Sequence, residues 1–208
     1  MTDDRRLAQG RRTRGRLLDR AAAAASERGL EGLSIARLAD DVGLSKSGVA
    51  ALYGSKEALQ LATVAHARDI FVREVVAPVW DRQPGLPRLR ALISSWIAYA
   101  GGGVFPGGCF LQHCLAEQAN RPGALRDALA ASRTDWLALL AQEIGEARRR
   151  GELAPQADPP RLAFEVEGLL AAGNRGHVLA DADALRWAAA ACEERISALV
   201  ADPGPESA

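Results

Sequence analysis

Three residues near the middle of the chain have side chains suited to redox or metal chemistry: Cys109, His113 and Cys114. Cys109 follows two glycines at the expected start of a helix, a position that favours the reactive thiolate. His113 lies four residues on, on the same face, and Cys114 is placed to act as a resolving thiol. This pattern predicts either a sensor of oxidants and electrophiles or, as is commoner for cysteine in an apolar helix, buried packing residues. A metal site lacks its third ligand, because Cys114 points elsewhere on the helix.

A second group of residues, between 34 and 56, has the chemistry of DNA contact. Ser47 can hydrogen-bond a base, and an alanine methyl can touch the methyl group of thymine. Lys46 and Lys56 suit phosphates, as do Ser34 and the free amides at the helix start that it caps. We therefore expect DNA contacts from Arg11, Arg12, Arg14, Ser34, Ser45, Lys46, Ser47, Gly48, Ala50, Ala51 and Lys56.

Basic residues are concentrated at the N-terminal end, although the formal net charge of the chain is zero. Residues 1–60 contain eleven basic and eight acidic side chains, and six of the arginines precede Leu17. Such a local excess of arginine favours attraction to a polyanion. We expect these arginines to follow the DNA backbone or to enter the minor groove.

Helical periodicity defines the elements that must position these residues. The composition is rich in alanine and leucine, and no run alternates as a strand does, so we predict an all-α fold. Gly43 breaks one helix (Ile35–Val42) from a second (to Tyr53), which predicts a helix-turn-helix with Val49 and Tyr53 turned inward. In a helical protein without DNA-binding activity, the same pattern is simply two packed helices. The expected helices are 13–28, 35–42, 45–53, 55–76, 87–100, 109–119, 123–150, 160–180 and 182–200.

These elements predict four parts of the chain. We expect a disordered basic arm at 1–10, a helix-turn-helix DNA-binding domain at 11–60, a helical domain for ligand binding and dimerisation at 61–200, and a disordered tail at 201–208. The chain has no apolar segment of membrane-spanning length, no signal-peptide core and an odd number of cysteines, which favours a reducing cytoplasm. No G-x-S-x-G elbow or dinucleotide loop is present, so we expect neither an enzyme nor a cofactor.

The stretch "TRGRLLDRAAAAASERGLEGLSIARLADDVGLSKSGVAALYGSKEAL" resembles the N-terminal domain of the TetR family of bacterial transcriptional regulators. The resemblance implies a homodimer that binds a palindromic operator, usually as a repressor, and a C-terminal domain that binds a small inducer. One departure stands out: where the family has aromatic residues and a histidine, this chain has Ala50, Ala51 and Leu52. That departure moves the expected contacts to Lys46, Ser47 and Lys56. A helical ligand-binding dimer whose DNA-binding head has decayed is the alternative.

The C-terminal half offers a ligand pocket and a dimer surface. Aromatic side chains with a few polar groups suit a small apolar or aromatic ligand, and Glu167 is an acid on a largely apolar helix. We expect ligand contacts from Trp96, Tyr99, Cys109, Phe110, His113, Trp136, Phe164 and Glu167. Two apolar stripes favour a four-helix dimer interface, with an intrachain core as the alternative. The interface residues expected from them are Leu162, Val166, Leu169, Leu170, Leu185, Ala189, Cys192 and Ile196.

Overall fold

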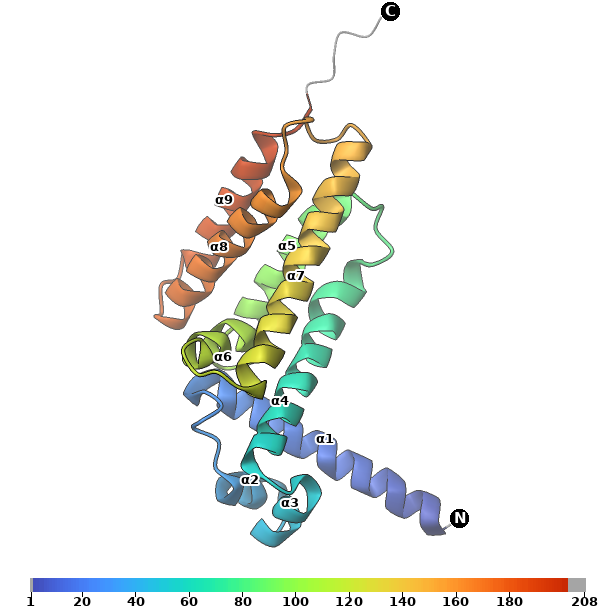
Figure 1. Cartoon of the computed structure of the whole chain (residues 1–208), viewed down its shortest axis with the longest axis vertical. Coiled ribbons are helices and arrows are strands. Elements are labelled where there is room, and N and C mark those ends of the chain that lie inside the picture. The colour runs from blue at the N-terminus through green and yellow to red at the C-terminus, as the bar shows by residue number, and fades with distance from the viewer. Residues whose placement is uncertain (1, 202–208) are drawn as a thin grey trace, which may run out of the picture. The chain divides into compact units, whose positions relative to one another are not determined.

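The computed structural model describes residues 2–201 of the 208-residue chain, with side chains from Gln9 onward. Within that range the chain is all-α, as predicted, and its one β-contact is an isolated bridge between Leu153 and Val200. No described helix is both long enough and apolar enough to cross a lipid bilayer. The helices (Figure 1) are α1 Thr2–Arg28, α2 Ile35–Val42, α3 Lys46–Tyr53, α4 Lys56–Phe71, α5 Leu86–Gly101, α6 Phe110–Gln118, α7 Ala124–Arg149, α8 Pro159–Val178 and α9 Ala184–Ser197.

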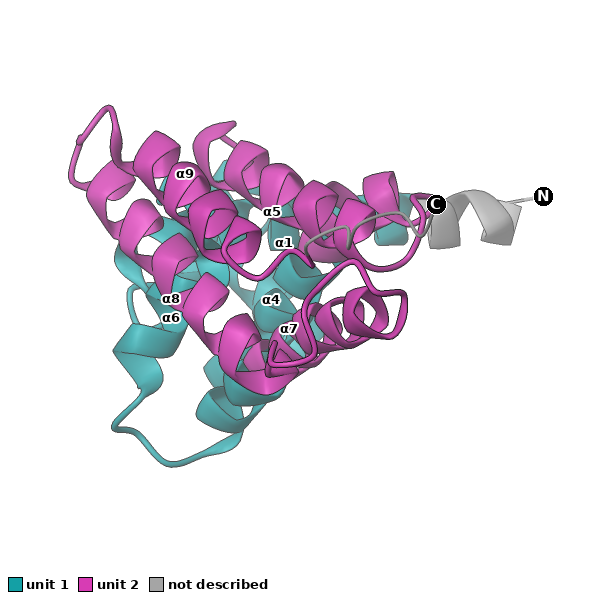
Figure 2. Cartoon of the chain, turned by 90° about the horizontal axis from the view of Figure 1, so that it is seen from above, with its two compact units in different colours: residues 1–70, 105–132 teal, residues 71–104, 133–208 magenta. Residues whose placement is uncertain are grey.

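The chain forms two compact units (Figure 2). Unit 1 contains the residues up to Ile70 together with Phe105–Ser132, and unit 2 contains Phe71–Val104 and the residues from Arg133. The expected boundary at residue 60 therefore differs from the structure. Unit 1 includes α6, because this helix packs on α1.

The first helix starts earlier than predicted. The expected disordered arm at 1–10 is, from Thr2, the beginning of α1, so that prediction is wrong. A polar composition does not exclude a helix. The expected tail lies outside the described residues, apart from Ala201.

Short alanine side chains in the core of unit 1 let the packed segments approach closely. Leu17, Ala21 and Ala25 lie on the buried face of α1. The segment before α6 approaches this face so closely that a Cβ on Gly107 would lie 1.9 Å from the carbonyl oxygen of Ser26. The Gly107 amide donates to the Ser26 Oγ at 3.1 Å. Only glycine fits here, and it lets α6 dock on the end of α1.

The predicted helix 55–76 changes type part-way. The α-helix α4 ends at Phe71, a π-helical turn (η1, Val72–Val76) follows, and a 3₁₀ turn (η2, Ala77–Val79) contains Pro78. Branched Val side chains are restricted in an α-helix, and Pro78 has no N–H to continue it. The π turn lies at the point where the chain passes from unit 1 to unit 2.

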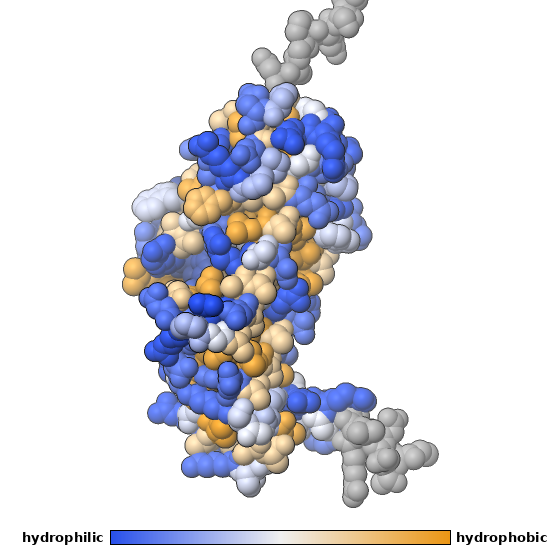
Figure 3. Space-filling view, viewed as in Figure 1, coloured by the Kyte–Doolittle hydropathy of each residue, from blue (hydrophilic) through white to orange (hydrophobic). Residues whose placement is uncertain are grey.

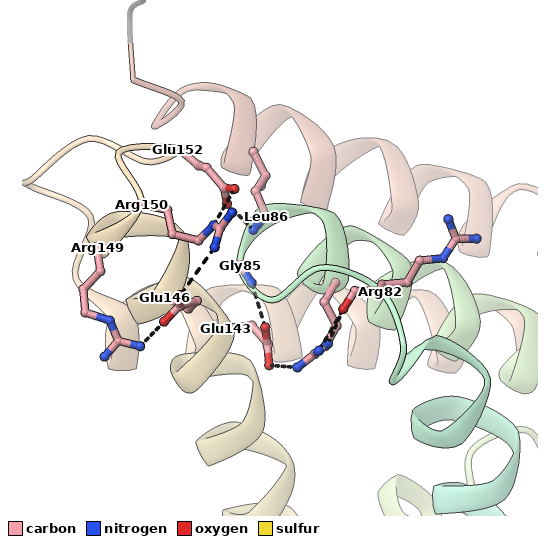
Figure 4. A network of polar contacts seen from close by, with 9 residues as sticks. Arg82, Gly85, Leu86, Glu143, Glu146, Arg149, Arg150 and Glu152 are labelled. Carbon is pink, nitrogen blue, oxygen red and sulfur yellow. Dashed lines mark hydrogen bonds and ion pairs between the residues drawn. The ribbon is translucent and has the colours of Figure 1, made fainter.

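In unit 2, two carboxylates from the α7 end hold the start of α5 (Figure 4). Glu143, which is buried, accepts from the Gly85 amide at 2.9 Å and pairs with the guanidinium of Arg88 at 3.2 Å. Glu152 accepts from the Leu86 amide at 2.7 Å and from Arg150. These bonds satisfy amides at the α5 N-terminus that no helical carbonyl can reach.

Candidate DNA-binding and ligand-response site

Two capped helices form the predicted helix-turn-helix. Ser34 caps α2 by accepting from the Arg37 amide, and Ser45 caps α3 by accepting from the Gly48 amide at 3.0 Å. Gly43 has φ +70°, a left-handed conformation that glycine adopts without strain. Val49 is buried, and Tyr53 is partly buried. The turn therefore fixes α3 against α2 with its opposite face free.

The outward face of α3 is made of short side chains. Lys46, Ser47, Ala50 and Ala51 are exposed, and Leu52 is 41% exposed on a flank of the helix. The Ser47 hydroxyl lies 3.0 Å from the Oγ of the capping serine. One hydrogen-bonding group of Ser47 is therefore used inside the helix.

The arginines predicted to contact DNA lie on α1, and two of them have partners within it or beside it. Arg11, Arg12 and Arg14 are all exposed. Arg12 donates to Gln9 at 3.0 Å, and the guanidinium of Arg14 lies 5.1 Å from the centroid of the Tyr53 ring. This cation–π contact joins α1 to the end of α3. The Tyr53 hydroxyl itself is buried with no hydrogen-bond partner among the described residues.

Lys56, expected to bind phosphate, has an internal partner. Its Nζ donates to the Glu31 carbonyl at 2.7 Å and lies 3.7 Å from the Glu31 carboxylate. Arg121, after α6, lies 3.7 Å from the same carboxylate. The turn between α1 and α2 is thus tied both to the start of α4 and to the segment after α6.

Glu117 on α6 holds that turn directly, and no sequence pattern indicated it. Its carboxylate accepts from the backbone amides of Leu30 at 2.7 Å and Glu31 at 3.1 Å. Gly29 has φ +74°, and a Cβ there would lie 2.3 Å from a Glu117 oxygen. Gln60 of α4 donates to the Leu30 carbonyl at 2.8 Å. We call this set, residues Gly29–Glu31 with Glu117 and Gln60, the turn clamp.

The cysteines of the predicted thiol site are buried. Cys109 precedes α6 without making a side-chain cap, and the Cys114 thiol donates to the Ala25 carbonyl at 3.7 Å. Burial, with the nearby Glu117 carboxylate, raises the pKa of the Cys114 thiol far above its usual range. This disfavours the thiolate that a resolving cysteine needs. Among the described residues, no group of three or more His, Cys, Asp or Glu side chains is placed to hold a metal ion.

The predicted ligand residues are divided between the two units. Cys109, Phe110 and His113 belong to unit 1, whereas Trp96, Tyr99, Trp136, Phe164 and Glu167 belong to unit 2. Phe164 is 62% exposed in the single chain. Glu167 pairs with Arg133 at 3.0 Å, a partner that the sequence analysis did not identify.

An aromatic cluster remains in unit 2. Phe71, which the sequence analysis missed, packs edge-on against Tyr99 at 5.5 Å and against Trp136 at 5.2 Å between ring centroids. Trp96, on the same helix as Tyr99, is buried. Phe71 is the last residue of α4, and the other residues of that helix belong to unit 1.

The predicted dimer stripes are mostly core. Five of the eight residues are already buried within one chain, so they have no surface left for a second: Leu162, Val166, Leu170, Cys192 and Ile196. Leu169, Leu185 and Ala189 are half-buried. Gly173 and Gly176 explain the burial, because a Cβ on either would lie 2.5 Å from an alanine Cβ of α9. The stripes are therefore the surfaces by which α8 and α9 pack on each other.

Three large apolar side chains of α8, its C-terminal end and α9 are exposed. Phe164 is 62% exposed, Leu179 at the end of α8 is 77% exposed, and Trp187 on α9 is 54% exposed. Apolar surface is visible over these two helices at the left of Figure 3. Large exposed apolar groups of this kind indicate an interaction surface.

Two family models match the chain. Residues 17–63 match the model of bacterial regulatory proteins of the tetR family, and residues 85–192, just over half of the chain, match the tetracyclin repressor-like C-terminal domain. The chain belongs to the TetR family. It is therefore a DNA-binding transcriptional regulator with the fold that the sequence predicted. No curated protein matches it significantly.

Solved structures agree with this TetR-family assignment. A TetR regulator from Chloroflexus aurantiacus is 24% identical, with a TM-score of 0.85 over 93% of this chain and 98% of that one. AibR, solved with isovaleryl coenzyme A and operator DNA, is 26% identical, with a TM-score of 0.63 over 76% and 84%. Reduced NemR of E. coli is 19% identical, with a TM-score of 0.77 over 93% and 99%. At 24% and 19% identity, the first and third show the fold alone.

Proposed function

We propose that this TetR-family regulator is a repressor that a small apolar or aromatic inducer releases from a palindromic operator. The turn clamp carries the proposal. Glu117 lies inside the region matched by the C-terminal domain model, yet its carboxylate bonds to the turn that precedes α2 of the helix-turn-helix. A ligand-induced movement of α6 therefore acts on the DNA-binding head through two short hydrogen bonds.

The inducer class follows from the chemistry of unit 2. Phe71, Tyr99 and Trp136 offer aromatic surface, and the Arg133–Glu167 pair offers one cationic and one anionic group. An apolar or aromatic molecule with one polar group fits such surroundings. Acyl-coenzyme A thioesters belong in the test set, because AibR was solved with one. The inducer must bind the DNA-free state more tightly than the DNA-bound state, since only a difference in affinity shifts the equilibrium.

The exposed apolar side chains of α8 and α9 support a homodimer. A two-fold interface uses the same patch on both chains, and Phe164, Leu179 and Trp187 supply bulky groups for it. A dimer places two α3 helices in successive major grooves, about 34–36 Å apart. We expect Trp187→Arg to make the protein monomeric in light-scattering analysis, while Trp80→Arg, at another exposed tryptophan, leaves the dimer intact.

The decisive experiment is selection of bound sequences from a random DNA pool, followed by anisotropy titrations at two salt concentrations. A palindrome preferred over random DNA by about a thousandfold, with a steep salt dependence, supports the proposal. Weak binding without sequence preference supports the decayed-head alternative instead. Inducer candidates are then tested for release of the selected DNA. Equal affinity of every candidate for free and DNA-bound protein contradicts the ligand-responsive part.

A further inference from the structure

The outward face of α3 has little capacity for hydrogen bonds to bases. Val49 is buried, so helical periodicity places Ser47 and Ala51 on the opposite side, with Ala50 about 100° round the helix from Val49. All three are exposed. Charged and amide side chains read base edges: Arg or Lys reads guanine, Asn or Gln reads adenine, and Asp or Glu reads cytosine. Among these types, α3 contains only Lys46, at its first residue.

Several polar groups on and beside α3 have partners within unit 1. The Ser45 Oγ accepts the Gly48 amide and contacts the Ser47 hydroxyl, both at 3.0 Å. Arg14 stacks on Tyr53 at the far end of α3, and the Lys56 ammonium is held by the turn after α1. Besides Lys46 at the first position of α3, the residues that remain to face the major groove are the two alanines and one side of Ser47.

We propose that Ala50 and Ala51 are specificity-determining residues that read thymine through its C5 methyl group. Thymine is the one unmodified base that presents a methyl group in the major groove. Short side chains let the α3 backbone come close enough for methyl–methyl contact, whereas longer ones would hold the helix away. Each operator half-site then has thymine opposite these two residues. This inference rests on the proposed operator binding and adds the chemistry by which the operator is recognised.

The test replaces thymine with uracil, which lacks only the methyl group. Each thymine of the selected half-site is replaced singly with deoxyuridine, and Kd is measured by anisotropy with the full-length protein. We expect about fourfold weaker binding for each contacted methyl, from the transfer free energy of one buried methyl group. Symmetric replacement in both half-sites is expected to weaken binding by about 15-fold. Uracil in the flanking DNA is the control and is expected to leave Kd unchanged.

A second arm assigns the contact to a residue. Ala50→Ser keeps the size of the side chain but makes it polar, and Ala50→Gly removes the methyl group. In both variants the penalty for uracil opposite residue 50 is expected to disappear, while the penalty opposite Ala51 remains. Circular dichroism confirms that each variant keeps its helices, and the serine variant covers the case in which glycine weakens α3.

Two results overturn the inference, and they are distinguishable. If selection recovers a palindrome but no uracil replacement within the half-site changes Kd by more than about 1.5-fold, thymine methyls are not read and the repressor proposal stands. If selection recovers no preferred sequence, the repressor proposal fails and this inference fails with it.

Discussion

The turn clamp makes a quantitative prediction for Glu117→Ala. The Glu117 carboxylate accepts two backbone N–H bonds, at 2.7 and 3.1 Å, and the Leu30 amide that makes the shorter one belongs to a fully buried residue. A hydrogen bond to a charged group contributes about 1.5–3 kcal/mol, and a buried amide left without a partner costs about 1–3 kcal/mol. One of the two bonds lies at the surface, so we expect the variant to lower the free energy of unfolding of unit 1 by about 3 kcal/mol in total.

The positions of the tryptophans make this effect measurable unit by unit. All four, Trp80, Trp96, Trp136 and Trp187, belong to unit 2, whereas far-UV circular dichroism reports the helices of both units. In urea, Glu117→Ala is expected to lose part of its helical signal about 1–2 M earlier than the wild type, with an unchanged midpoint of tryptophan fluorescence.

Two variants control this experiment. Glu27→Ala removes an exposed carboxylate of α1, two residues before the turn, and should leave both curves unchanged. Glu117→Gln keeps one acceptor oxygen and should fall between the wild type and the alanine variant. Superimposable urea curves for Glu117→Ala, Glu27→Ala and the wild type would refute the role of the clamp and remove the main support for signalling through α6.

Three further predictions concern other parts of the molecule. Glu143→Gln leaves a buried guanidinium without its charge partner and should lower the unfolding midpoint of tryptophan fluorescence by the equivalent of about 3 kcal/mol, whereas Glu146→Gln, at a surface ion pair, should cost less than about 1 kcal/mol. Gly107→Ala places a Cβ against a carbonyl oxygen of α1. This variant should lower the free energy of unfolding of unit 1, measured by the helical signal, by more than about 2 kcal/mol without shifting the midpoint of tryptophan fluorescence. Burial raises the pKa of the Cys192 thiol to about 12 and that of Cys114 further. Native protein should therefore react with a thiol reagent at pH 8 far more slowly than urea-unfolded protein, and equal reaction rates would contradict the burial. The free energy of unfolding should be retained below about pH 9 and fall as the pH rises towards 12, because the unfolded thiols lose their protons first.

Local signals were sufficient to predict the helix-turn-helix. Ser34 and Ser45 cap the helices that they precede, and Gly43 adopts the left-handed conformation that the turn needs. These features depend on neighbours a few residues away, so they can be predicted from the local sequence pattern. The apolar stripes of α8 and α9 were also recognised from the sequence. Their periodicity alone does not distinguish a core within one chain from an interface between two chains.

The turn clamp could not be predicted from local sequence patterns. Glu117 lies 87 residues from Leu30 along the chain, and an isolated glutamate on a short helix has no spacing that marks it as a cap. Phe71 was missed for a related reason: the periodicity of α4 continued past it and hid the change to a π turn. Lys56 carried the right charge for phosphate, but its partner on the α1–α2 turn becomes visible only once the fold is known.

The two-segment construction of unit 1 has a consequence for synthesis on the ribosome. The residues up to Ile70 emerge first, but Gly107, Cys114 and Glu117, which close the unit around the end of α1, follow only after α5 has been made. The nascent head therefore carries unpaired amides and an uncovered alanine face until α6 leaves the exit tunnel. A chain released early, by truncation or a premature stop, would lack a finished unit 1, so completion of the unit that contains the helix-turn-helix depends on synthesis of α6.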